Sequence, residues 1–279
     1  MNTTRGSSRP RVAAMPRVCV SALVVLLTVG GTATSANAQR GLASRIEAVK
    51  SGRVRLTFAA REGVCGNGMS WFRTRNGSYT GSFNGNWSGS RDVEATCDRG
   101  PVRLVLVRVD GETTELRTYV GGRWKADTGI TDLGNVSAPE AGAWLLQLAE
   151  SGPVKPARSA ITAATITDSL EASSTLLRIA KNESRPSEVR ASALNWLGEV
   201  VGDNVSSTLD SMAYEPGDRE VRRQAIYALS RRPSDESVPA LLKMAESLPD
   251  REMRKTAVYW LVQSKDPRAV AWMEKRLGR

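Results

Sequence analysis

The chain has 279 residues, and its 39 lysines and arginines against 29 aspartates and glutamates give a formal net charge of +10 at pH 7. It contains no histidine, so the commonest general base and the commonest side-chain metal ligand are both missing. A chain of this length folds as one or two domains, and its composition excludes catalytic triads and metal sites that depend on histidine.

Residues 1–38 predict a secretory signal peptide. Arginines at positions 5, 9, 11 and 17 precede an apolar run from Val18 to Val29, and the segment ends on the small residues Ala36-Asn37-Ala38. The run is too short to cross a bilayer, and the residues before Cys19 are unlike a lipoprotein cleavage site. We therefore expect export to the periplasm or the extracellular space, with no stable membrane insertion after cleavage.

The charge of the exported chain bears on its partners. Removal of residues 1–38 takes away four arginines and no acids, which lowers the net charge from +10 to +6. A basic protein outside the cytoplasm does not usually meet nucleic acid, so we expect no nucleic-acid partner. The arginine pairs are candidate contacts for a partner or an acidic envelope surface, or else part of a solvated helix face. These candidates are Arg222, Arg223, Arg231 and Arg232.

Two cysteines, Cys65 and Cys97, remain after the predicted cleavage. An even pair in an exported protein predicts a disulfide, which would stabilise the fold by about 3–4 kcal/mol for a loop of this length. A reactive thiol is the competing interpretation, but the chain has no histidine to activate one.

Residues 39–137 predict a small β-rich domain, because alternating apolar residues occur among many Gly, Ser, Asn and Thr. Asp110-Gly111 separates two such runs and is a strong hairpin signal. We expect a small antiparallel sheet of about four or five strands. The predicted elements are a helix at 42–50, strands at 54–58, 102–109 and 114–120, and a weaker hairpin that joins 69–74 to 78–80 through Asn76-Gly77.

The segment 76–90 carries three aromatic residues, Tyr79, Phe83 and Trp87, at every fourth position among small polar residues. Such side chains can stack on sugar rings or on a partner's surface. The alternative, which we favour, is a loop whose aromatic residues fold back onto the sheet.

Residues 138–279 contain a repeat. The phrases Glu188-Val189-Arg190, Glu220-Val221-Arg222 and Glu252-Met253-Arg254 are spaced by 32 residues, and each is followed by apolar residues at helical spacing. A fixed period of this kind predicts stacked helical hairpins in which neighbouring units bury each other's apolar faces. Three earlier helices, at 141–150, 157–166 and 173–181, fit a degraded unit with an opening cap.

Each repeat is predicted to begin with the helix that carries the phrase, followed by a turn and a second helix. The apolar stripe of the first such helix is Val189, Ala193, Trp196, Leu197 and Val200. The second helices are predicted at 205–212, 238–248 and 269–277, and the N-caps of the first helices at Ser187, Asp218 and Asp250.

The three phrases, together with Asp266-Pro267-Arg268-Ala269-Val270, resemble HEAT repeats of the short, bilin-lyase-like form. The whole layout resembles exported bacterial HEAT-repeat proteins, with matching segments at 63–68 and 117–124. This resemblance implies an α+β chain in which the small antiparallel domain is followed by a right-handed α-solenoid. It also implies that Arg190, Arg222 and Arg254 pair with aspartates within and between repeats; the alternative is a basic strip for an acidic partner.

We predict no catalytic residue, no metal site and no cofactor, because no phosphate loop, no Gly-x-Ser-x-Gly elbow and no paired catalytic carboxylates occur. The leading hypothesis is an exported, non-enzymatic interaction or scaffold module for an unknown protein partner. The alternatives are a carbohydrate-binding or hydrolytic envelope protein that uses the 76–90 loop, and a structural envelope component. Trp196, Tyr227, Trp260 and Trp272 are expected to pack between helices.

Overall fold

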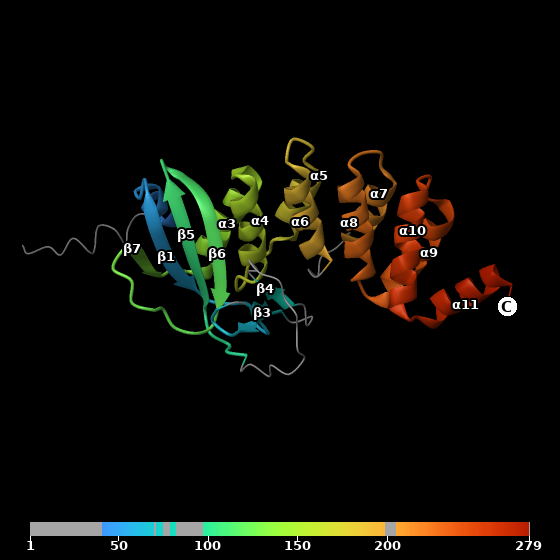
Figure 1. Cartoon of the computed structure of the whole chain (residues 1–279), viewed down its shortest axis with the longest axis horizontal. Helices are drawn as coiled ribbons and strands as arrows, with labels where there is room; N and C mark the ends of the chain where they lie inside the picture. The colour runs from blue at the N-terminus through green and yellow to red at the C-terminus, as the bar shows by residue number, and fades with distance from the viewer. Residues whose placement is uncertain (1–40, 70, 75–78, 82–96, 199–204, 279) are drawn as a thin grey trace, which may run out of the picture. The chain divides into compact units, whose positions relative to one another are not determined.

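The structure is a computed structural model that describes residues 41–69, 71–74, 79–81, 97–198 and 205–278 (Figure 1). The predicted signal peptide, Val200 and most of the 76–90 segment lie outside these residues. The β region contains α2 (Leu42–Glu47), β1 (Gly52–Phe58), β2 (Cys65–Gly66), β3 (Trp71–Arg73), β4 (Tyr79–Gly81), β5 (Val102–Val109), β6 (Glu112–Val120) and β7 (Ile130–Asn135). The helical region contains α3 (Ala138–Ser151), α4 (Val154–Thr165), α5 (Ser173–Lys181), α6 (Ser187–Leu197), α7 (Val205–Tyr214), α8 (Arg219–Ser230), α9 (Ser234–Ser247), α10 (Arg251–Ser264) and α11 (Pro267–Leu277).

The larger sheet has four strands in the order β6-β5-β1-β7. The prediction of antiparallel pairing is right for β1 with β5 and for β5 with β6. It is wrong for β7, which pairs with β1 in parallel, so the sheet is mixed. Strand β7 was not predicted, because no residue of Ile130–Asn135 is buried and the alternating apolar pattern is therefore missing.

The Asp110-Gly111 hairpin is confirmed. It connects β5 to β6, with positive φ angles of 51° at Asp110 and 86° at Gly111. A two-residue turn of this kind requires a left-handed backbone at both positions, and Asp followed by Gly adopts it at low cost. The sequence signal was reliable here because the turn depends on these two residues alone.

A second, three-stranded sheet has the order β2-β3-β4. The antiparallel pairing of β3 with β4 confirms the weaker predicted hairpin, although its turn at Asn76-Gly77 is outside the described residues. The predicted disulfide between Cys65 and Cys97 is present. Beside it, Gly66 and Asp98 form an isolated antiparallel bridge, so the disulfide joins β2 to the segment that leads into β5.

One face of the larger sheet is buried against helices. Val54, Leu56 and Phe58 alternate with more exposed residues along β1 and are fully buried, as are Leu104 and Leu106 on β5. Helix α4 packs on β6, and the backbone just after β1 hydrogen-bonds to the segment that follows α4. The sheet and the helical region therefore share one continuous hydrophobic core. The two-domain division at residue 138 stays a prediction.

From α3 onward the described chain is helical, and the helices pack on one another along the region (Figure 1). The predicted stripe residues that the structure describes are buried, from Val189 and Ala193 on α6 to Met253 and Leu261 on α10, except Trp260, which is partly buried. The chain is thus an α+β protein with a mixed β region followed by a helical repeat solenoid.

The helices pair differently from the predicted split. Among repeat helices that follow one another in the chain, α5 packs extensively on α6, α7 on α8 and α9 on α10, whereas α6, α8 and α10 pack much less on the helices that follow them. Each hairpin therefore ends, rather than begins, with the helix that carries the Glu-Val-Arg or Glu-Met-Arg phrase. We call α5, α7 and α9 the A helices and α6, α8 and α10 the B helices. A period fixes the length of a unit but not its starting point, which is why the sequence left the phase undecided.

The predicted N-caps are right at two positions of three. Asp218 accepts hydrogen bonds from the amides of Glu220 and Val221, and Asp250 accepts the equivalent pair at the start of α10. The prediction is wrong at Ser187, which is the first residue of α6, while Pro186 occupies the N-cap position.

Candidate functional site

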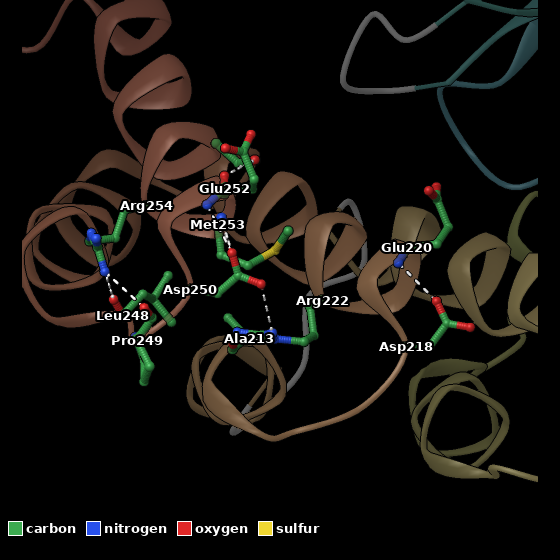
Figure 2. A network of polar contacts seen from close by, with 11 residues as sticks. Ala213, Asp218, Glu220, Arg222, Leu248, Pro249, Asp250, Glu252, Met253 and Arg254 are labelled. Atoms are coloured by element: carbon green, nitrogen blue, oxygen red, sulfur yellow. Dashed lines mark hydrogen bonds and ion pairs between the residues drawn. The ribbon is translucent and has the colours of Figure 1, made fainter.

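The phrase arginines hold each hairpin together. On α6, Arg190 Nε donates to the carbonyl of Ala180, and on α8, Arg222 Nε donates to that of Ala213, at 3.0 and 3.1 Å. On α10, Arg254 Nη1 donates to the carbonyl of Leu248 at 2.5 Å (Figure 2). All three acceptors are at or just beyond the C-terminal end of the preceding A helix, where carbonyls have no partner within the helix. Each arginine therefore donates a hydrogen bond to a carbonyl at the end of the helix that packs against the arginine's own helix.

Asp250 links this arrangement to the next repeat. Its carboxylate caps α10 and lies 3.4 Å from Nη1 of Arg222 on α8 (Figure 2). The hydrogen bond from the Glu252 amide, followed by that of Met253 and nearby arginines, lowers the pKa of Asp250. The side chain of Arg222 is only 13% exposed. Among the described residues, the pairing with aspartate expected from the HEAT resemblance is present for Arg222 alone of the three arginines, and between repeats rather than within one. Together with the carbonyl contacts, it favours the structural interpretation of the arginine ladder.

The other candidate arginines also have partners within the chain. Arg223 is exposed and forms an ion pair with Glu220 on its own helix. Arg231 donates to the Tyr227 hydroxyl at 2.8 Å, and Arg232 donates to the Ser206 hydroxyl at 3.0 Å. A partner-binding role for the four arginines stays a prediction, but Arg222 and Arg232 contact neighbouring helices and Arg231 contacts Tyr227 of its own helix.

The aromatic candidates of the 76–90 segment cannot be placed against these residues. The backbone of Tyr79 belongs to β4, while its side chain, Phe83 and Trp87 lie outside the description. Their binding role stays a prediction.

A groove of about 540 Å³ lies between the B helices α8 and α10. Its lining combines aromatic rings with polar and charged side chains, a mixture typical of protein-binding surfaces. The lining residues are Arg223, Gln224, Tyr227, Glu252, Lys255, Thr256, Tyr259 and Trp260.

The repeat period builds this groove. Tyr227 and Tyr259 are 32 residues apart and occupy equivalent positions on α8 and α10, as do Arg223 and Lys255. Each of these cations pairs with a glutamate three residues earlier on its own helix. On α6 the position equivalent to the tyrosines is Asn195, whose side-chain oxygen accepts a hydrogen bond from Gln224 at 3.3 Å. The pair of equivalent tyrosines is therefore confined to the last two B helices.

Three rings form a connected aromatic cluster at the groove. Trp260 contacts Tyr227 at a centroid distance of 4.8 Å and Tyr259 at 4.9 Å, the latter edge to face. Tyr259 is 55% exposed, whereas Trp260 is partly buried and packs against the Tyr259 ring. Such edge-to-face pairs hold a ring in one orientation, which reduces the entropy lost when a partner contacts it.

The sequence analysis recognised part of this cluster. Trp196 packs in the core as expected, with its Nε1 donating to the Thr162 hydroxyl at 3.2 Å. Tyr227 and Trp260 also pack between helices but line the groove at the same time. Tyr259 was missed, and its signal was the offset of 32 residues from Tyr227.

Stacked helical hairpins that share a continuous core and present a repeated surface define an α-helical repeat protein. Residues 207–279 match the family model of HEAT repeats, and the chain is a HEAT-repeat protein over this region. A comparison with curated proteins finds no match.

HEAT repeats are typically non-catalytic binding modules, and the groove has the chemistry of noncovalent recognition: an aromatic platform beside paired charges. Across the described ranges, no group of three or more Cys, Asp or Glu residues is placed to hold a metal ion. Within the same ranges, no helix has the length and apolar character that crossing a bilayer requires.

Proposed function

We propose that the chain is an exported, non-enzymatic protein-interaction module that binds a protein partner at the groove between α8 and α10. The observation that carries the proposal is Tyr259, a large aromatic side chain that is 55% exposed yet held edge to face against Trp260. Tyrosine and tryptophan dominate the binding energy of protein interfaces, because they bury much area with few rotatable bonds.

The charges of the groove support a protein partner over a small ion. Arg223 and Lys255 are each paired with a glutamate on the same helix, so they form a balanced polar rim around the rings. A polar rim around a rigid aromatic centre is the usual anatomy of a protein interface. A rim of this kind contributes to specificity and encounter rate more than to affinity.

Export is supported by the pattern of residues 1–38 and by the disulfide between Cys65 and Cys97, since disulfides persist in oxidising compartments. Mass spectrometry of the protein recovered from the envelope or medium tests this part. A mature N-terminus at Gln39 is the expected result, and an uncleaved chain in the cytoplasm would contradict it.

Site-specific photocrosslinking tests the binding surface. Tyr259 and Tyr214 are replaced in turn by p-benzoylphenylalanine in the full chain; Tyr214 is on α7 and its hydroxyl lies 2.8 Å from that of Ser247 on α9, away from the groove. We expect a discrete crosslinked protein from position 259 that is absent from position 214. Tyr259→Ala should remove the same partner from affinity purification, while Tyr214→Phe should retain it. Equal crosslinking from both positions would count against the groove.

The alternative, a carbohydrate-binding or hydrolytic role for the 76–90 loop, depends on side chains outside the described residues. No geometry therefore supports it.

A further inference from the structure

The second face of the larger sheet forms a groove of about 630 Å³ that is rich in cations. It is lined by the alternate residues of β1, β5 and β6 whose neighbours are buried in the core, and by the loop that follows β6. The lining includes Arg55, Met69, Arg103, Val105, Arg123 and Trp124.

Strand register arranges these side chains as a grid. Across the sheet, Val105 on β5 is paired with Arg55 on β1 on one side and with Arg117 on β6 on the other. The neighbouring row on this face pairs Arg103 with Tyr119. The apolar floor of the groove is therefore bordered by guanidinium groups on both sides.

Some of these cations are neutralised within the chain. Arg53 pairs with Asp127 and Arg55 with Asp132, both at 2.8 Å, and Arg117 pairs with Glu115 at 2.7 Å. Three further cations of the lining, Arg103, Arg123 and Lys125, have no carboxylate within ion-pair distance among the described residues. The groove thus carries positive charge in excess of its own acids.

Arg103 is the most unusual of the three. The residue is 5% exposed, and burial lowers the pKa of its guanidinium. Its two terminal nitrogens donate to the carbonyls of Arg123 and Gly68, but its Nε is buried and has no hydrogen-bond partner within the part of the chain described. Asp98 attracts this guanidinium without forming an ion pair with it, and burial remains the larger effect on its pKa. Burial of a cation that is not fully compensated is costly, and a bound anion would offset that cost.

Trp124 gives the groove an aromatic element. Its ring lies between two guanidinium groups, with the Cζ of Arg103 at 4.7 Å and that of Arg55 at 5.2 Å from the ring centroid. These cation–π contacts hold both arginines over the groove. Apolar surface lies beside them, including Met69, which is 66% exposed. The groove therefore offers two kinds of contact at once, cationic and apolar.

We infer that the open face of the sheet binds an extended acidic peptide segment of a partner protein, in which carboxylates alternate with apolar side chains. The positive charges are spread over three strands and a loop, which fits several carboxylates along a chain better than one small anion. A peptide also supplies apolar side chains for the valine floor and Met69, which a phosphate or sugar backbone lacks. Planar guanidinium groups recognise carboxylates through paired hydrogen bonds. This surface is separate from the α8–α10 groove, so the inference goes beyond the proposed function.

The test uses the full chain and a fluorescein-labelled peptide of eight residues that alternates glutamate or aspartate with valine or leucine. Binding is measured by fluorescence anisotropy at about 0.05 M and 0.3 M salt, since screening weakens exposed ionic contacts. The groove variant is Arg123→Glu with Lys125→Glu, two exposed cations outside the strands. The control is Lys155→Glu with Arg158→Glu, two exposed cations on α4 that change the net charge equally.

We expect the groove variant to weaken binding at least about tenfold and the control less than about twofold. A matched peptide with serine in place of valine and leucine should also bind about tenfold more weakly. Equal loss in the two protein variants would overturn the inference, because it would show a response to net charge alone. Tighter binding of polyglutamate, heparin or single-stranded DNA than of the alternating peptide would overturn it too, in favour of a general polyanion site. Absence of peptide binding at a peptide concentration of about 1 mM would also overturn the inference.

Discussion

The repeats and the open face of the sheet differ in how their arginines are satisfied. In the repeats, Arg190, Arg222 and Arg254 are directed to carbonyls at or just beyond the ends of neighbouring helices, and Arg222 also meets Asp250. On the open face of the sheet, Arg103 is more deeply buried; it donates to the carbonyls of Arg123 and Gly68, but its Nε has no hydrogen-bond partner among the described residues. The phrase arginines recur with the repeat period and belong to the scaffold, whereas Arg103 lies outside any repeat and keeps one buried donor unsatisfied, which fits the ligand-binding face inferred above.

The largest expected effect tests whether both regions depend on one core. Leu229 on α8 and Leu104 on β5 are both completely buried. Either Leu→Ala change should reduce the free energy of unfolding by about 2–5 kcal/mol, measured by urea denaturation. The control, Leu277→Ala, removes a side chain that is 76% exposed and should cost less than about 0.5 kcal/mol. A cost below about 0.5 kcal/mol at Leu229 would show that the repeats do not bury it.

A smaller effect separates scaffold arginines from surface arginines. Arg222→Met removes both the hydrogen bond to Ala213 and the link to Asp250, and should destabilise the chain by about 1–3 kcal/mol. Arg223→Met, at the next position, removes only an exposed ion pair and should cost less than about 0.5 kcal/mol. Thermal unfolding of the two variants side by side measures the difference. Similar costs would mean that the ladder is not structural.

The smallest effect concerns the last helix and appears as a pH dependence. The side-chain hydrogen bond from Arg268, with that of its backbone amide, lowers the pKa of Asp266 from 3.8 to about 2. A lowered pKa in the folded state contributes stability above the ordinary pKa, and this contribution is lost as the pH falls from about 4 through about 2.

Asp266→Asn should therefore lower the midpoint of thermal unfolding at pH 7 and lower it much less at pH 2. Lys265→Gln is the control, because it changes the charge of the neighbouring residue without altering this carboxylate. A constant difference between wild type and Asp266→Asn across this range would contradict the assignment.

The sequence predicted elements best where a local rule was sufficient. Asp110 and Gly111 define their own turn, and the stripe residues on α8 and α10 are buried because their spacing matches one helix face. Strand β7 escaped prediction because its residues are not buried and it is held by backbone pairing to β1. Ser187 was misplaced by one position, because Pro186 occupies the N-cap and the helix already begins at Ser187.

The sites required the tertiary structure. Nothing local distinguishes Tyr259 from other surface tyrosines until α8 and α10 lie side by side and Trp260 supports the ring. In the same way, the sequence alone does not distinguish Arg103 from the other arginines at alternating positions of the predicted strands. Its burial and its lack of a carboxylate partner in the described chain follow from the position of Trp124 and of the segment that contains Gly68.

By itself, the sequence determined the helical repeat, its 32-residue period, the disulfide pair and the main hairpin, because each depends on residue types at fixed spacing along the chain. The tertiary structure decided the pairing of A with B helices, the parallel edge strand and the two grooves. These depend on which surfaces remain after distant segments have packed together, and spacing along a single chain does not encode that information locally.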